Sequence, residues 1–429
     1  MYKKRIADEI LQEWLESSGC VLIEGSKWCG KTTTAEQVAG SIVYMADQND
    51  GARNVQLART SPSYLLAGKT PRLIDEWQVV PTLWDAVRFE VDHRREVGQF
   101  ILTGSSVPAK RDEIVHSGTG RITPVLMRPM SLWESEDSTG QLSLAELFEQ
   151  PEQLLSESNI DIEQLAYLVC RGGWPFALTV RSKKAALNQA TAYYTGVVGV
   201  GNGENSDISR ADNVRRDPER VKRLMRSLSR NIGSQASLTT IYDDIKVNEE
   251  EQLSEDVIGQ YIKALKKIFV VEDMRAWNPN LRSKTAVRTA DTRYFVDPSI
   301  AVAALGIGPK DLLMDLKTFG LLFECMAARD LRVYADALDG EVYHYRDKSE
   351  LECDAVVHLR NGRYGLVEIK LGGEDLIEDG ATALKELAGK IDTTKMQKPS
   401  FMMVLVGVGR YAYRREDGVY VVPIGCLKP

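Results

Sequence analysis

The chain has 429 residues, of which 43% are hydrophobic and 27% are charged. This is ordinary globular composition, and it excludes collagen-like, fibrous and disordered chains. At roughly 100 to 200 residues per domain, the length predicts two to four domains. The net charge of -7 excludes a polycation over the whole chain and leaves a local basic face open.

The spacing of the cysteines and the pattern of the first residues indicate the cellular compartment of the protein. The six cysteines form no Cys-x-x-Cys pair and the four histidines do not cluster with them, so we predict neither a zinc site nor a disulfide framework. Residues 1–19 carry apolar residues at helical spacing among charges, which indicates an amphipathic helix and not a signal peptide. No apolar stretch approaches the roughly 18 residues of a membrane-spanning helix. We therefore predict a cytoplasmic protein without a membrane partner.

The first motif is GSKWCGKT, which runs from Gly25 to Thr32 between an apolar strand and a helix beginning near Thr32. Glycines let the loop curl so that backbone N–H groups point at phosphate. Lys31 then reaches the β and γ phosphates, and the Thr32 hydroxyl is a magnesium ligand. The alternative is a glycine-rich turn that only links strand to helix. We predict that ATP and Mg²⁺ are bound by Gly25, Ser26, Lys27, Trp28, Cys29, Gly30, Lys31, Thr32 and Thr33.

Two further apolar strands end in polar side chains. The first ends in Asp75, which would hold magnesium through water, and Glu76, which would polarise the attacking water. The alternative for this pair is a plain surface carboxylate pair. The second strand ends in hydroxyls, where Thr103 and Ser105 would sense the γ phosphate. Three such strand ends with helices between them predict an α/β fold whose parallel sheet has its ligands at the carboxyl edge.

These motifs resemble those of prokaryotic AAA-type ATPases related to the STAND clade, and the likeness covers nearly the whole chain. It implies an ATPase core, a helical lid that starts at Trp174, a winged-helix segment and a C-terminal domain similar to PD-(D/E)xK nucleases. It also implies that Arg121 is an arginine finger or a γ-phosphate sensor; the alternative is packing without phosphate. Trp28 and Cys29 are unusual loop residues. The likeness is carried by GSKWCGKT, LIDEWQ at 73–78, LTGSS at 102–106, GRITPVLMRPMSLWE at 120–134 and GGWP at 172–175.

The residue patterns in the middle of the chain predict helices. Amphipathic patterns cover 149–181 and 183–198, and a polar linker at 199–206 indicates a boundary. Three helical patterns at 218–231, 238–245 and 254–268, followed by short strands at 269–275 and 293–296, have winged-helix order. The predicted domains are the ATPase core 1–148, the helical lid 149–205, the winged helix 206–308 and the nuclease-like domain 309–429.

DNA is a candidate partner of the winged helix. The third helix would enter a groove by Ser254, Glu255 and Asp256, and their charge repels phosphate, so we predict no DNA reading by this helix. Basic residues near the wing could touch a backbone without sequence preference. The alternative is a solvated loop or an interdomain packing module. These basic residues are Arg275, Arg282, Lys284, Arg288 and Arg293.

The last domain carries a second candidate site. A helix with Glu324 precedes three strands, of which two carry Glu352-Cys353-Asp354 and Glu368-Ile369-Lys370. By resemblance, this is the acidic, acidic-x-Lys pattern of PD-(D/E)xK nucleases, with Glu324 as the helical glutamate. It implies magnesium held by Asp354 and Glu368, with Lys370 positioning water or stabilising charge.

The turn Arg360-Asn361-Gly362 predicts the register of these two strands. A three-residue loop with glycine in the left-handed position pairs Leu359 with Arg363. Asp354 then faces Glu368, Glu352 faces Lys370, and all four lie on one face, whereas Cys353, Ala355, Val357 and Leu359 lie on an apolar face. A two-residue turn would separate Asp354 from Glu368 and Lys370. The uniformly apolar face favours the longer loop.

Two functions stay open. The leading hypothesis is an ATP-controlled enzyme that acts on DNA, and the alternative is a nucleotide switch whose inactive nuclease-like domain only binds partners. A second copy of the chain is a candidate partner, because Arg121 would act on a neighbour's nucleotide. The predicted catalytic residues are Lys31, Glu76, Arg121, Glu324, Asp354, Glu368 and Lys370.

Overall fold

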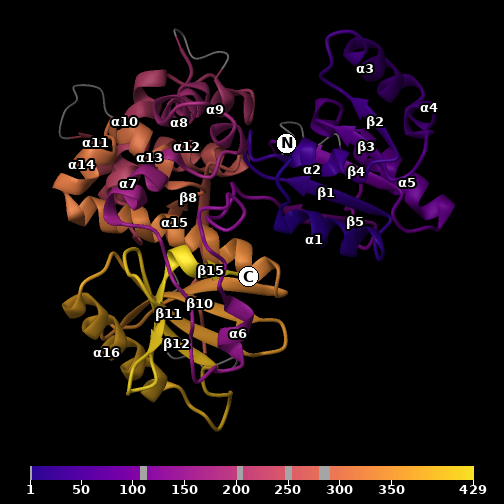
Figure 1. Cartoon of the computed structure of the whole chain (residues 1–429). Helices are drawn as coiled ribbons and strands as arrows, with labels where there is room; N and C mark the ends of the chain where they lie inside the picture. Colours follow the sequence, from indigo (N-terminus) through magenta and orange to yellow (C-terminus); the bar gives the residue numbers. More distant parts are fainter. Residues whose placement is uncertain (1, 107–113, 201–205, 247–253, 280–289) are drawn as a thin grey trace. The chain divides into compact units, whose positions relative to one another are not determined.

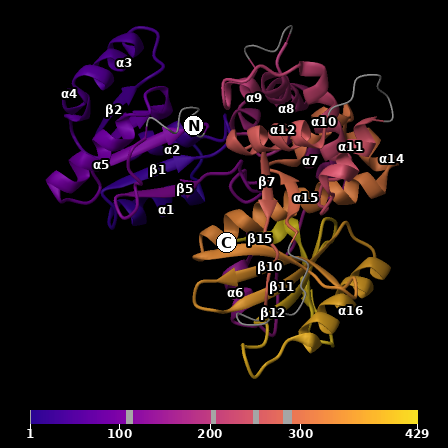
Figure 2. The ribbon, with the colours of Figure 1, turned by 180° about the vertical axis from the view of Figure 1, so that it is seen from behind.

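The structure is a computed structural model that describes residues 2–106, 114–200, 206–246, 254–279 and 290–429. Its internal contacts divide the chain into two units, and Figures 1 and 2 show the chain from opposite sides. None of the described helices is long and apolar enough to cross a membrane. Unit 1 comprises Met1–Pro129, Thr195–Val221 and Gly259–Val270, and unit 2 comprises Met130–Tyr194, Lys222–Ile258 and Val271–Pro429.

A parallel sheet forms the centre of unit 1. Its five described strands have the order β2-β3-β4-β1-β5, so that β4 lies between β1 and β3. Since parallel strands end at the same edge, the residues that follow β1, β3 and β4 meet there. The parallel α/β core is therefore confirmed. The strands are β1 (Cys20–Glu24), β2 (Ser41–Tyr44), β3 (Arg72–Asp75), β4 (Phe100–Gly104) and β5 (Ile122–Leu126).

Helices cover both faces of this sheet because successive side chains of a strand point to opposite sides. Leu22 and Ile74 pack toward α3 (Gly51–Thr60), α4 (Pro62–Leu66) and α5 (Leu83–Arg94). Val21 and Ile101 pack on the other side, toward α1 (Ile6–Leu15) and α2 (Lys31–Glu36). Burial on both faces explains why the central strands β1 and β4 are apolar over most of their length.

The predicted helices of the middle segment agree with the structure to within a residue at each end for α8, α10, α11 and α12. The hairpin β7–β8 follows, as expected for the two short strands. The elements are α7 (Ile162–Arg171), α8 (Lys183–Val198), α9 (Asp207–Arg210), α10 (Pro218–Arg230), α11 (Leu238–Lys246), α12 (Glu255–Lys267), β7 (Val271–Met274), β8 (Thr292–Phe295), α13 (Pro298–Leu305) and α14 (Pro309–Met314).

The helical pattern predicted over 149–181 is partly wrong. After α6 (Leu144–Phe148), the chain is irregular up to residue 161, and only α7 and a 3₁₀ turn at Pro175–Leu178 are helical. The backbone of Ser156 and Ser158 instead bonds with Ala412 and Arg410 in the same unit. These long-range bonds satisfy backbone groups that a helix would otherwise use internally.

Unit 2 contains a mixed sheet of six described strands in the order β13-β14-β12-β11-β10-β9. Its core side, which includes Val356 and Leu366, packs against α16. The helix α15 precedes the sheet in sequence, and a short pair, β6 (Leu142–Ser143) with β15 (Leu427–Lys428), lies apart from it. The elements are α15 (Leu316–Asp336), β9 (Gly340–Arg346), β10 (Glu352–Leu359), β11 (Tyr364–Lys370), α16 (Glu374–Lys390), β12 (Phe401–Val406), β13 (Tyr413–Arg414) and β14 (Tyr420–Pro423).

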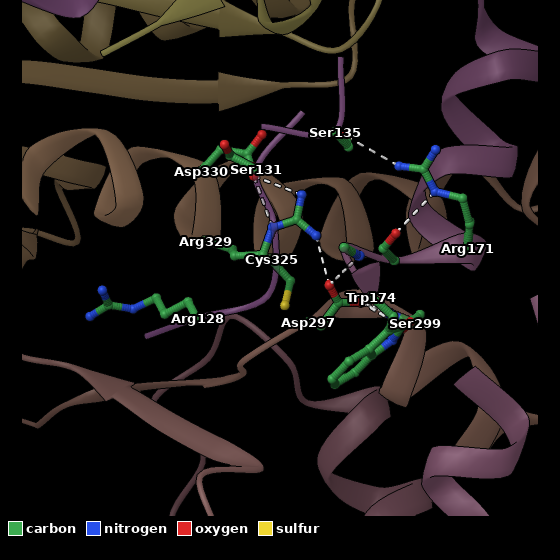
Figure 3. A network of polar contacts seen from close by, with 12 residues as sticks. Arg128, Ser131, Ser135, Arg171, Trp174, Asp297, Ser299, Cys325, Arg329 and Asp330 are labelled. Carbon is green, nitrogen blue, oxygen red and sulfur yellow. Dashed lines mark hydrogen bonds and ion pairs between the residues drawn. The ribbon is translucent and has the colours of Figure 1, made fainter. Parts of the chain in front are cut away.

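A buried polar network ties separate segments of unit 2 to α15 (Figure 3). The guanidinium of Arg329 donates to Asp297 at 2.6 Å and to Asp330 at 2.8 Å, and all three side chains are almost fully buried. Asp330 accepts the backbone N–H of Leu132, and Asp297 accepts that of Gly173. The network therefore fixes both the chain that enters unit 2 and the GGWP segment.

Trp174 lies in this packed region of unit 2. Its indole N–H donates to Ser299 at 2.9 Å, and its ring stacks on Tyr193 with centroids 4.3 Å apart. A Cβ added to Gly172 would come within 2.3 Å of Asp297, so the close approach requires glycine. The local role of GGWP is thus to pack against the segment that begins α13. Its assignment as the start of a lid remains a prediction.

Candidate functional site

The loop between β1 and α2 lies at the carboxyl edge of the parallel sheet. Gly25 and Gly30 have φ values of 149° and 108°, which side chains rarely allow. A Cβ on Gly25 would lie 2.1 Å from the carbonyl oxygen of Met127. The buried Cys29 thiol donates to that same oxygen at 3.3 Å. The contacts with Met127, which lies outside the loop, therefore fix the curl of the loop, and the side chain of Cys29 faces the protein interior.

Lys31 and Ser26 show how this loop could receive phosphate. The Lys31 ammonium is buried and donates to the carbonyls of Gly25 at 2.9 Å and Ser26 at 2.7 Å. The Ser26 hydroxyl is buried and finds no hydrogen-bond partner within the described part of the chain. Since buried hydroxyls are normally bonded, this one is available to a polar ligand. Both groups fit a phosphate-binding loop.

The other predicted loop residues are more exposed. Lys27 forms an ion pair with Asp207, also in unit 1, at 2.5 Å. Trp28 has a positive φ of 65° and a side chain at the surface, and Thr33 is also exposed. The structure thus places these side chains around the loop rather than inside it.

Asp75 joins two of the three strand ends. Its Oδ1 accepts hydrogen bonds from Thr32 at 2.6 Å and from Thr103 at 2.7 Å. Thr32 lies in the first turn of α2, which follows the loop, whereas Thr103 lies on β4. Hydroxyl and carboxylate oxygens are the ligands that Mg²⁺ prefers. The structure therefore brings together Thr32 and Asp75, which were assigned to magnesium, and Thr103, one of the residues assigned to the γ phosphate.

Glu76 is held beside this group. Its backbone is left-handed, with φ of 56°, and its carboxylate accepts a hydrogen bond from Ser105 at 3.2 Å. The Gln78 amide donates to the same carboxylate. The sequence analysis did not assign Gln78 a role, although it lies in the LIDEWQ stretch only two residues beyond Glu76. Two donors thus orient the predicted catalytic carboxylate.

Arg121 is not brought to this loop. It precedes β5, which pairs with β1 in parallel so that Cys20 lies opposite Ile122. The loop follows the other end of β1, so Arg121 lies at the opposite edge of the sheet. Its guanidinium pairs with Asp92 at 2.8 Å and its side chain is 46% exposed. A γ-phosphate sensor for its own nucleotide does not fit this placement; action on a neighbouring copy stays a prediction.

The second site begins with the β10–β11 hairpin. Ala355 lies opposite Val367 and His358 opposite Tyr364. The N–H of Leu359 donates to the carbonyl of Arg363, and Gly362 has a left-handed φ of 86°. The three-residue turn and the predicted register from Ala355 to His358 are therefore confirmed, and this pairing does not extend to Asp354 or Glu352.

A β-bulge changes the faces of β10. The register between β10 and β9 shifts between Cys353 and Val356, and Cys353 packs with Val356 against α16. The prediction that Cys353 shares the opposite face with Ala355 is wrong, because a bulge interrupts side-chain alternation. Glu352 is exposed and pairs with Arg346 at 2.9 Å.

Asp354, Glu368 and Lys370 form a compact cluster. The Lys370 ammonium donates to Glu368 at 2.5 Å and to Asp354 at 3.2 Å. The N–H of Ile369 donates to Asp354 at 2.7 Å. From α15, Glu324 accepts a hydrogen bond at 2.5 Å from Tyr294. The sequence analysis missed Tyr294, since nothing in the local sequence of β8 connects it with α15.

Burial controls the charges of this cluster. It raises the pKa of Glu324 and of Glu368 to about 8, and repulsion from Asp354 adds to the effect. Burial alone would lower the pKa of Lys370. The neighbouring Asp354 and Glu368 raise it by a larger amount, so the net shift is upward and the ammonium stays protonated. Among the residues that the structure describes, no three His, Cys, Asp or Glu side chains form a metal-binding group. A divalent ion here would have to replace the ammonium between Asp354 and Glu368.

The sheet order and the loop are similar to those of P-loop domains. Comparison with known families agrees, because residues 17–136 match an AAA domain family. Two further segments match families described as domains of unknown function. These are residues 162–311 with DUF8612 and residues 319–427 with DUF4143.

Similar proteins extend over nearly the whole chain. An uncharacterized protein of Mycobacterium tuberculosis and one of Mycobacterium bovis are each 22% identical over 425 residues, which is 99% of this chain and 84% of each relative. A Walker-type ATPase of Pyrococcus abyssi is 14% identical, covering 71% of this chain and 96% of its own, with a TM-score of 0.42. The Hef helicase domain of Pyrococcus furiosus is 11% identical, covering 95% and 86%, with a TM-score of 0.20. At these scores, the fold assignment rests on the AAA match and the sheet order.

Proposed function

We propose that unit 1 binds ATP with Mg²⁺ and hydrolyses it. The supporting observation is the convergence of Thr32 and Thr103 on one oxygen of Asp75 beside the loop. Thr32 and Asp75 would hold Mg²⁺, which neutralises phosphate charge when bound. Lys31 would turn from its loop carbonyls to the β and γ phosphates. Glu76 would accept the proton of the attacking water while Ser105 holds its carboxylate.

Two substitutions separate binding from turnover. Lys31→Ala should abolish tight ATP binding, because it removes the cation over the phosphates. Glu76→Gln should bind ATP like the parent and lose turnover by about 100-fold or more, because an amide cannot accept the proton. Equilibrium binding of a fluorescent ATP analogue and phosphate release measure the two effects. Lys69→Ala, an exposed lysine of the same unit, is the control. Parental turnover in Glu76→Gln would remove Glu76 as the base.

The cluster in unit 2 supports a second candidate function, metal-dependent DNA cleavage controlled by ATP. The order α15, β9, β10, β11, α16, β12 fits the nuclease-like domain proposed at 309–429. Asp354 and Glu368 would hold the divalent ion, which supplies Lewis-acid activation of water, with Glu324 and Lys370 beside them. The alternative is an inactive cluster, held together by Lys370, in a domain that binds partners under nucleotide control.

Cleavage of plasmid and single-stranded DNA with Mg²⁺ distinguishes these two functions. For the nuclease, Asp354→Ala should reduce cleavage to background and leave ATP hydrolysis largely unchanged, because the two sites belong to different units. Glu352→Gln, on the same strand but paired with Arg346, should cleave like the parent. If the parent cleaves neither substrate, the partner-binding switch becomes the better account.

The family matches support the proposed domains unevenly. The AAA match lies inside the proposed core 1–148, and the match at 319–427 lies inside the proposed C-terminal domain. The match at 162–311 spans both the proposed lid, 149–205, and the proposed winged helix, 206–308. Of the proposed wing cations, Arg275 pairs with Glu341, while Arg282, Lys284 and Arg288 lie outside the described residues.

A further inference from the structure

The part of α10 in unit 2 separates basic from apolar residues on two faces. Leu224, Met225 and Leu228 are buried. The exposed residues of this part are all basic, and they recur at the spacing of three and four residues that places side chains on one helical face. They are Lys222, Arg223, Arg226 and Arg230, and we call them the basic stripe.

The basic stripe concentrates positive charge in a chain whose net charge is -7. Its last member, Arg230, pairs with Asp244 of α11 at 2.7 Å. Glu219, one turn before the stripe, adds one acidic group on the same helix. The four cations rise along the helix axis over about 12 Å. Duplex DNA carries about seven phosphate charges over that length.

We propose that the basic stripe binds the phosphate backbone of duplex DNA without sequence preference. Three of its four members are arginines, whose planar donors suit phosphate oxygens. The complementarity is one of charge alone, which is typical of contacts that position DNA rather than read its bases. The binding is independent of ATP hydrolysis and of the carboxylate cluster. It also differs from readout by α12, which begins with Glu255 and Asp256.

The composition of the stripe favours DNA over a protein or a membrane. Protein interfaces need an apolar centre, and the exposed residues of the stripe include no apolar side chain. Helices that lie on membranes insert apolar residues into the lipid, and all the apolar residues of this part of α10 are buried in the protein. Contacts with phosphate require neither an apolar centre nor apolar side chains that insert into lipid.

The test is binding of the full chain to a labelled 30-base-pair DNA of mixed sequence, in EDTA and without nucleotide. The triple substitution Lys222→Gln, Arg223→Gln and Arg226→Gln should weaken binding at least tenfold at low salt. It should also make the slope of log affinity against log salt shallower by about 2 to 3. Changing the DNA sequence should leave the affinity of the parent unchanged within about threefold.

Two controls distinguish a folding defect from the loss of a contact with DNA. Arg53→Gln with Arg59→Gln removes two exposed charges from α3 and should leave DNA affinity unchanged. Arg223→Lys with Arg226→Lys keeps the charge and should retain most of the binding. Binding by the triple variant with parental affinity and salt slope would overturn the proposal. Failure of the parent to bind DNA at low salt, or binding only to vesicles of anionic lipid, would do the same.

Discussion

Arg329 is a buried cation in a network that reaches residues far away in the sequence. Its partners, Asp297 and Asp330, also hold the backbone of Gly173 and Leu132. The sequence analysis found GGWP only as a motif, because no local pattern connects residue 173 with residue 297. By contrast, Gly25 to Thr32 lie within one loop, and their local spacing was enough to predict their placement. The placement of a residue can thus be predicted from the sequence where its partners lie close to it in the chain.

Arg329 should contribute strongly to the stability of unit 2. Arg329→Met keeps most of the volume but leaves two carboxylates buried without their cation. We expect the free energy of unfolding of unit 2 to fall by about 3 to 5 kcal/mol. Urea unfolding followed by tryptophan fluorescence measures this, because Trp174 lies in the same region. Arg181→Met, an exposed change in the same unit, should cost less than about 0.5 kcal/mol. Equal midpoints for the two variants would contradict a stabilising role for the network.

The β10–β11 hairpin shows what an element's own sequence can predict. The turn at Gly362 and the alternation of apolar residues were enough for the register, which brings Asp354 and Glu368 together around Lys370. They did not predict the bulge, because it arises in the pairing of β10 with β9, a different neighbour. Nor could they predict that Tyr294 bonds Glu324, since β8 and α15 are brought together by tertiary packing.

The carboxylates of this element predict a pH dependence of stability. Burial raises the pKa of Glu368 from 4.5 to about 8 in the folded protein. Below about pH 4.5 both the folded and the unfolded states hold the proton. Between about 4.5 and 8 only the folded state keeps it, so the free energy of unfolding falls as pH rises. We expect thermal unfolding of unit 2 at a lower temperature at pH 8 than at pH 5.5.

Glu368→Gln should reduce this difference, because the amide does not titrate. The expected change is on the order of a few kcal/mol between the two pH values for the parent. Glu386→Gln, an exposed change on α16, should behave like the parent. If the parent and Glu368→Gln show the same difference between pH 5.5 and pH 8, the titrating group is another one.

At the scale of the whole molecule, unit 1 was easier to predict than unit 2. The strands β1, β3 and β4 are largely buried, and recognisable polar residues lie at or just after their carboxyl ends, so the ligand edge of the sheet follows from local motifs. The segment after residue 148 looked helical, yet it forms long-range backbone bonds with residues 410–412. Such pairing across the chain leaves no periodic pattern in either segment. The predicted role of Arg121 would likewise depend on something outside its own fold, namely a second copy.

The placement of Arg121 gives a sharp test for such a second copy. Arg121 lies at the sheet edge opposite its own loop, so it can reach a nucleotide only on a neighbouring molecule. Arg121→Ala should then lower turnover by about tenfold or more with nearly unchanged ATP affinity, because the cation acts on transition-state charge. Arg88→Ala, which removes another partner of Asp92, should have little effect.

Mixing two impaired variants decides whether Arg121 acts between copies. Arg121→Ala keeps an intact loop, and Lys31→Ala keeps an intact Arg121. In a mixed assembly, the loop of the first can therefore face the arginine of the second, and part of the lost phosphate release should return. The specific activity of the parent should also rise with protein concentration, because assembly precedes turnover. No recovery on mixing, together with a concentration-independent specific activity from a confirmed monomer, would exclude the role between copies.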